Sequence, residues 1–204
     1  MLQKAFFKVN VVDRIYDTPV FEKMTPGAYE FTVPEEYNYV VIEYAGGAGG
    51  GIVGSGALQD RNGGKGGIKS LTISITSRKI IGIVGQAGKN GGIGSAVPKG
   101  GTGNVNGENG TQGDKFLSYY VYSGAGGGST SVQINQKTYE ASAGGGGFDK
   151  GAGSYGGKGG GAYGGGRQTS FANGKDATDP NQIGLNSGNG YVKIWAGYDP
   201  YFKG

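Results

Sequence analysis

The side chains that most often carry out enzymatic chemistry are absent from this chain or unfavourably spaced in it. The 204 residues include no histidine and no cysteine, which removes the commonest general base, a principal metal ligand and every thiolate nucleophile. Glu35 and Glu36 are adjacent, so on an extended chain they would point to opposite faces and could not bracket one bond. We interpret them as solvated turn residues after Pro34. The sequence therefore predicts no enzymatic activity, no metal site and no cofactor.

Glycine–lysine pairs raise the question of a phosphate-binding loop. Such a loop needs Ser or Thr directly after the lysine, whereas Lys65, Lys89, Lys158 and Lys175 are followed by Gly, Asn, Gly and Asp. GxGxxG strings arise from composition alone in so glycine-rich a chain and do not predict a dinucleotide site. The formal glycosylation sequon at 109–111 is interpreted as a turn.

Charge and hydropathy limit the classes of partner. Nineteen Lys and Arg against 15 Asp and Glu give a formal net charge of +4, which is too small to indicate nucleic acid. No apolar run approaches the ~20 residues of a membrane span, and the apolar stretch near Met1 is too short and interrupted for a signal peptide. We expect no nucleic-acid partner, no membrane insertion and no signal peptide.

The residues that interrupt the glycine runs offer the chemistry of recognition. Tyr and Arg supply contact area at low entropic cost, and both are enriched where proteins bind one another. The alternative is that these aromatic side chains fold back and cover the protein's own surface. The candidate binding residues, at predicted turns between glycine segments, are Arg61, Lys99, Phe148, Tyr155, Tyr163, Arg167 and Phe171.

Between the glycine runs, alternating apolar and polar residues predict β-strands. No stretch has a helical period, so about eight strands form an all-β skeleton. Asn-Gly occurs six times, at Asn62, Asn90, Asn106, Asn109, Asn173 and Asn189, and each pair is interpreted as compatible with a turn. The expected strands are 28–33, 37–45, 69–76, 79–84, 116–122, 132–141, 191–196 and the segment KAFFKVNVV near the start.

Glycine occupies 48 positions. We expect residues 1–204 to form a single domain, which the distribution of glycine divides into a segment of ordinary composition and several glycine-rich insertions. Residues 1–45 have ordinary composition and form the candidate attachment side, whereas the glycine-rich insertions fall at 46–67, 82–113, 124–128 and 144–166. Such insertions are either flexible tethers, the default for this composition, or ordered segments.

A three-residue spacing favours the ordered alternative. Glycines recur at 88, 91 and 94, at 107, 110 and 113, and at 153, 156 and 159. Three residues per turn is the repeat of the polyproline II helix, which has no internal hydrogen bonds. If the facing positions lack side chains, neighbouring helices can approach until backbone amides pair laterally. The strands at both ends of each run would clamp such a bundle.

Four blocks occur in order along the chain: TPGAYEFTVPEEYNYVVIEYAGGAGGG, LTISITSRKIIGIVGQAGKNGG, GGGSTSVQINQKTYEASAGGGG and SGNGYVKIWA. Together they resemble the glycine-rich domain family of bacteriophage tail proteins, bacterial surface proteins and the ectodomain of anaplastic lymphoma kinase. The resemblance implies a β-sandwich of the jelly-roll or TNF-like type whose loops expand into a bundle of polyglycine II helices. Val97, Asn106 and the charged inserts depart from the pattern.

The resemblance also implies a role. We expect a virion protein on the surface of a bacteriophage particle, associated with the tail or tail fibre and displaying a rigid surface to a host receptor. Its partners would be other virion proteins, through self-association or docking on a larger assembly. The alternatives are a capsid decoration or cement protein and, because flat glycine bundles can present regular ridges, an ice-binding protein.

Overall fold

The computed structural model describes residues 18–54, 59–94, 96–116, 118–149 and 152–202. Across these residues the chain forms twelve β-strands in antiparallel sheets and no helix, so none could cross a membrane, and the predicted all-β class is confirmed. The strands are β1 (Phe21–Lys23), β2 (Gly27–Thr32), β3 (Tyr39–Ala45), β4 (Gly66–Ser74), β5 (Lys79–Val84), β6 (Gly92–Gly94), β7 (Gln112–Phe116), β8 (Tyr119–Tyr122), β9 (Thr130–Ile134), β10 (Lys137–Ala141), β11 (Gly184–Asn186) and β12 (Tyr191–Gly197).

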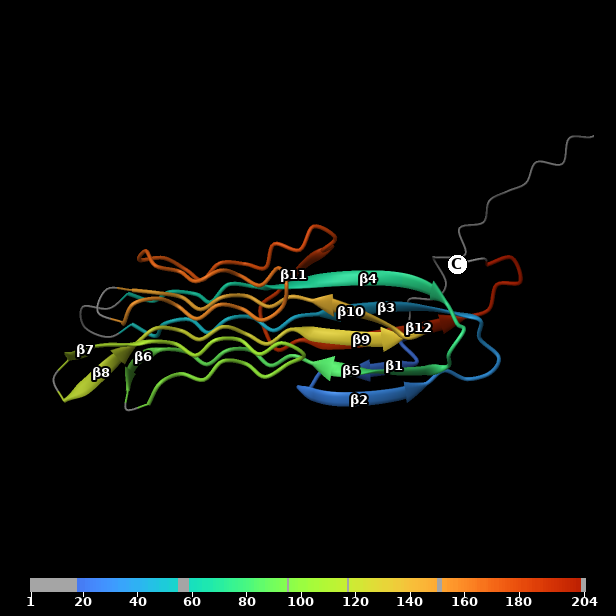
Figure 1. The fold of residues 1–204 in the computed structure, drawn as a ribbon, viewed down its shortest axis with the longest axis horizontal. Coiled ribbons are helices and arrows are strands. Elements are labelled where there is room, and N and C mark those ends of the chain that lie inside the picture. Colours follow the sequence, from blue (N-terminus) through green and yellow to red (C-terminus); the bar gives the residue numbers. More distant parts are fainter. Residues whose placement is uncertain (1–17, 55–58, 95, 117, 150–151, 203–204) are drawn as a thin grey trace, which may run out of the picture.

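Two of the sheets form the predicted β-sandwich at one end of the elongated molecule (Figure 1). One sheet has the order β1-β12-β3-β4-β11 and the other β10-β9-β5-β2. Alternate residues of β3, Val40, Ile42 and Tyr44, are buried and join Ile80 and Val132 of the opposite sheet in one core. The strands therefore fold as their alternation predicts, with the apolar side chains of each facing the other sheet.

Most predicted strands are found with boundaries shifted by a few residues. The segment 79–84 coincides with β5, but 132–141 is a hairpin, because Asn135 and Gln136 have φ of 50° and 63° and form the turn between β9 and β10. The expected strand 116–122 is divided between the end of β7 and β8. The strand expected near the start lies outside the described residues.

Glycine-rich segments extend from the sandwich side by side and make up the other half of the molecule (Figure 1). We call this part the glycine bundle, made of the tracts 46–52, 63–66, 85–91, 100–103, 106–110, 123–129, 142–148, 156–160 and 164–166. Several tracts continue directly from strands, as 46–52 does from β3 and 85–91 does from β5. The sandwich thereby sets the spacing of the tracts.

The tract 123–129 runs through the centre of the glycine bundle. From 124 to 128 every backbone N–H donates to, and every carbonyl accepts from, a neighbouring tract, at donor–acceptor distances of 2.7 to 3.1 Å. The N–H groups of Gly124 and Gly127 both donate to tract 142–148, whereas that of Gly126 donates to Glu108. The same neighbour thus returns after three residues, which is the repeat of a helix with three residues per turn.

The tracts lie too close together for side chains between them. A Cβ atom added to Gly126 would overlap the carbonyl group of Lys158. Gly88 and Gly91, three residues apart, both turn toward the central tract, and a Cβ on either would overlap a carbonyl oxygen there. The three-residue spacing at Gly88 and Gly91 therefore marks positions that face a neighbouring backbone, whereas a Cβ at Gly94, the third glycine of that series, would meet only the Tyr122 ring, 3.9 Å away.

The interpretation of the Asn-Gly pairs as turns is wrong for most of them. Asn90, Asn109 and Asn173 lie within extended segments, and their side-chain Oδ1 atoms accept backbone N–H groups from Gly51, Gly100 and Asn62 at 2.8 to 3.0 Å. At the outside of the bundle these N–H groups donate to a side-chain amide oxygen rather than to a backbone carbonyl. Asparagine therefore completes the lateral bonding at the bundle's edge.

Candidate functional site

A small three-stranded sheet, with the order β6-β8-β7, lies at the end of the glycine bundle far from the sandwich, which we call the distal end (Figure 1). Val121 of β8 packs with Ile52, Ala152 and Ile93 in a small apolar cluster. This cluster anchors the sheet to the tracts that lead to it. The distal end is consequently a second, smaller packed unit that the glycine tracts hold away from the sandwich.

Aromatic and aliphatic side chains are exposed at the distal end. Tyr119 of β8 is 55 % exposed, Phe171 is 56 % exposed and Val53 is also exposed. Phe171 stacks on Phe148, with ring centroids 5.8 Å apart, while Phe148 is only 6 % exposed. Backbone bonds between Phe148 and Ala172 hold the two segments together. Of these two predicted binding residues, Phe148 is therefore a buried anchor and Phe171 is presented to solvent.

Arg61 joins the same region through an ion pair. Its Nε lies 3.4 Å from Oδ2 of Asp149, the residue after Phe148, and its guanidinium also donates to Gln59. The Asp149 carboxylate is buried and accepts the backbone N–H of Gln59 as well. The structure thus brings Arg61, Phe148 and Phe171, which are far apart in sequence, to one part of the molecule.

Tyr155 and Arg167 form a second group, and the carbonyl of Tyr155 accepts the hydroxyls of Thr111 and Ser123, which adjoin β7 and β8. The guanidinium carbon of Arg167 lies 4.3 Å from the centroid of the Tyr155 ring. Arg167 also donates to both carboxylate oxygens of Glu108, at 2.7 and 2.9 Å. These hydrogen bonds, against a smaller opposing effect of burial, lower the pKa of Glu108 and raise the pKa of Arg167. The Arg167 charge is already paired within the chain.

The last two predicted residues lie apart from these groups. Tyr163 is 47 % exposed, but its backbone N–H donates to Ser142, which directly follows β10 at the sandwich end of the bundle. Lys99 is exposed, and its carbonyl accepts the N–H of Lys89. The seven predicted residues therefore do not form one contact network: Arg61, Phe148 and Phe171 form one group and Tyr155 and Arg167 another, whereas the hydrogen bonds named here for Tyr163 and Lys99 lead to neither.

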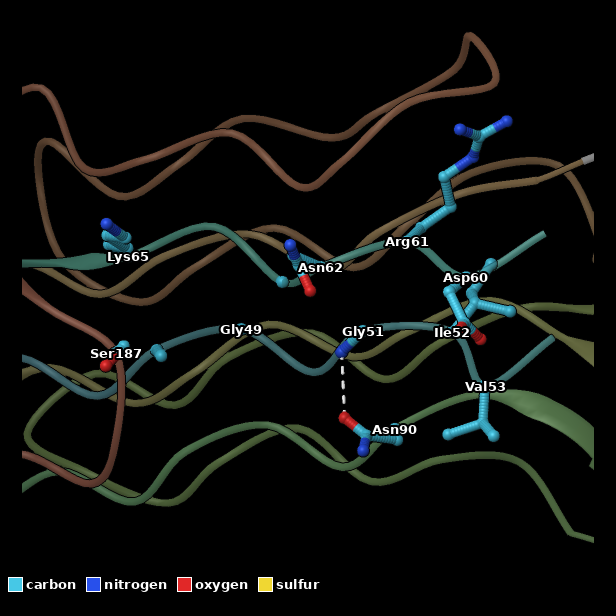
Figure 2. Close-up of a pocket in the computed structure, with 12 residues that line it drawn as sticks. Gly49, Gly51, Ile52, Val53, Asp60, Arg61, Asn62, Lys65, Asn90 and Ser187 are labelled. Atoms are coloured by element: carbon cyan, nitrogen blue, oxygen red, sulfur yellow. Dashed lines mark hydrogen bonds between the residues drawn. The ribbon is translucent and has the colours of Figure 1, made fainter.

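A groove along the glycine bundle was not predicted from the sequence. Its volume is about 560 Å³, and it is lined by residues of four separate segments, 48–53, 60–65, Asn90 and Ser187 (Figure 2). Asn90 turns its side-chain oxygen to the backbone N–H of Gly51, while the Arg61 guanidinium points away from the groove. No local pattern could have revealed this groove, because distant tracts build it. Its lining residues are Ala48, Gly49, Gly51, Ile52, Val53, Asp60, Arg61, Asn62, Gly63, Lys65, Asn90 and Ser187.

Metal chemistry receives no support from the described residues, because no three Asp or Glu side chains in them approach closely enough to hold an ion. Glu35 and Glu36 lie in an exposed turn after Pro34, as the sequence predicts.

A scan against protein-family models and a search of curated proteins both give no match to this chain. The chemistry of the distal end is therefore the main guide to function.

Proposed function

We propose that this protein is a non-enzymatic display module that binds a macromolecule through the distal end of its glycine bundle. The observation that carries the proposal is the exposure of Tyr119, Phe171 and Val53 at the far end of the glycine-rich tracts, where a small apolar cluster also packs. Exposed aromatic side chains on a rigid support are what a recognition surface needs, since little conformational freedom is lost on binding.

The biological setting of the proposal comes from the family resemblance. The target would be a receptor on a host bacterium, the protein would be part of a bacteriophage tail or tail fibre, and the sandwich would face the rest of the particle. A capsid cement protein is the alternative. Copy number in purified particles separates the two, because an adhesin is present in few copies and a cement protein in hundreds.

The test uses the fluorescently labelled full-length protein and a panel of whole bacterial cells. The double variant Tyr119→Ala/Phe171→Ala should lower cell binding by about tenfold or more, because central aromatic contacts in an interface each contribute about 2 kcal/mol or more. Two other exposed tyrosines, Tyr163 beside Ser142 and Tyr201 after β12, provide matched controls. Binding that is lost in Tyr163→Ala/Tyr201→Ala and kept in the distal variant would overturn the proposal.

A further inference from the structure

The six Asn-Gly pairs are chemically alike in sequence but not in the folded protein. In five of them the asparagine Oδ1 accepts a backbone N–H from another residue, and the N–H of the following glycine donates to a carbonyl of another segment. The five pairs begin at Asn90, Asn106, Asn109, Asn173 and Asn189.

Asn62 and Gly63 are the exception. Within the residues that the structure describes, neither the Asn62 side chain nor the Gly63 N–H makes a hydrogen bond. The backbone of Asn62 is nevertheless fixed, because its N–H donates to the side chain of Asn173 and its carbonyl accepts the N–H of Gly174. Asn62 is exposed, and both residues line the groove (Figure 2).

We infer that Asn62 is a site of spontaneous deamidation in the folded protein and that the other five asparagines are protected. In this reaction the backbone nitrogen of Gly63 bonds to Cγ of Asn62, the Cγ–Nδ2 bond breaks, and ammonia leaves with the former amide proton. Water then opens the five-membered ring to give aspartate or isoaspartate at position 62. The reaction requires only water, and it requires the attacking glycine nitrogen and the asparagine amide to be free.

Protection of the other five pairs follows from their hydrogen bonds. For Asn90, the reaction would need the Gly91 N–H to leave the carbonyl of Gly51 and the Asn90 side chain to release the Gly51 N–H. Both bonds must open before the ring can close, so reaction proceeds only from a rare, locally opened state. Among the described residues, none bonds to the Asn62 side chain or to the Gly63 N–H, so the reaction at Asn62 needs no such opening.

The product changes the groove. A carboxylate at position 62 adds a negative charge between Arg61 and Lys65, where the groove already contains Asp60. Isoaspartate also lengthens the backbone by one carbon next to Gly63, whose Cβ position is occupied by the carbonyl of Gly49. Age would therefore alter the charge of this groove, and in the isoaspartate form it would also alter the packing beside it.

Incubation of the full-length protein in mildly alkaline buffer, followed by peptide mapping with tandem mass spectrometry, tests the inference. Conversion at Asn62 should exceed that at each of the other five sites by about tenfold or more. In urea, where the chain is unfolded, all six sites should react at similar rates, and Asn62→Gln should remove the fast site from the folded protein. Equal rates at all six sites in the folded protein, or fastest reaction at another pair, would overturn the inference.

Discussion

The sandwich and the glycine bundle are both ordered, but different interactions stabilise them. In the sandwich, residues such as Ile42 and Ile80 are fully buried between sheets, and the hydrophobic effect stabilises the packing. In the glycine bundle, lateral amide hydrogen bonds between tracts replace this apolar packing, as around Gly126. Each such bond contributes only about 0.5–1.5 kcal/mol net, whereas ordering a residue costs about 1–2 kcal/mol.

Because of this difference, the glycine bundle depends on the sandwich more than the sandwich depends on the bundle. Because hydrogen bonds alone roughly balance the entropy of ordering, the glycine bundle needs the sandwich to hold its tracts at the right spacing. Tract 123–129 leads directly into β9, and tract 142–148 begins where β10 ends. The sandwich should therefore fold without a perfect bundle, whereas the bundle should not persist without the sandwich.

The largest effect is expected from a cavity in the sandwich. Ile42 is fully buried in β3, and Ile42→Ala should lower the free energy of unfolding by about 2–5 kcal/mol. Hydrogen exchange should then show faster opening in β3 and, at the same time, in the tracts of the glycine bundle. If the tracts keep their protection while the sandwich opens, the bundle is stable by itself and the dependence we describe is wrong.

An added methyl group inside the glycine bundle should have a smaller and local effect. Gly126→Ala places Cβ against the carbonyl of Lys158 and should cost about 1–3 kcal/mol. Exchange should accelerate in tract 123–129 and its neighbours while the amides of β3 stay protected. The matched control is Gly188→Ala, since no atom lies within 4 Å of a Cβ at that position. Equal losses in the two variants would argue against close packing of the tracts.

Sequence reasoning succeeds where a pattern is local and fails where distant segments meet. Alternation in segments such as 79–84 predicts strands, and the spacing of Gly88 and Gly91 predicts close backbone packing. The three-residue strands β1, β6 and β11 are too short to carry a pattern. The groove could not be predicted because tracts far apart in the sequence form it.

The error over the Asn-Gly pairs has a related cause. In an ordinary hairpin this dipeptide forms the turn, but the turn between β9 and β10 uses Asn135 and Gln136 instead. The side chain of Asn109 accepts a backbone N–H from a neighbouring tract. The next residue, Gly110, faces the central tract so closely that a Cβ atom would overlap a carbonyl oxygen there. Such a role depends on which tracts lie side by side, and no local window contains that information.

Alkaline pH should weaken the sandwich. Burial, above all, raises the pKa of Tyr29, Tyr44 and Tyr191 above the ordinary value of about 10, and all three belong to sandwich strands. Above pH 10 the folded state keeps protons that the unfolded chain releases. Stability is therefore complete below about pH 10 and falls above it, by up to about 1.4 kcal/mol per pH unit for each tyrosine.

Tyr29→Phe checks this titration. The variant should be less stable at neutral pH, because the Tyr29 hydroxyl donates to the carbonyl of Ser131 at 3.0 Å. Its loss of stability per pH unit above pH 10 should nonetheless be smaller than that of the parent protein, measured by urea unfolding at several pH values. An unchanged slope would mean that Tyr29 is not among the groups that titrate on unfolding.

The smallest effect is expected from the ion pair on the outside of the glycine bundle. The Glu108 pKa is lowered mainly by the hydrogen bond from Arg167, so the pair stabilises the fold above the ordinary carboxyl pKa of about 4.3 and less as pH falls below it. Glu108→Gln keeps an oxygen for the Lys158 N–H, removes the charge, and should lower the melting temperature only slightly at neutral pH. The difference should vanish in acid and in high salt. A large, salt-sensitive loss would mean that surface charge rather than neutral amide bonding holds the tracts together.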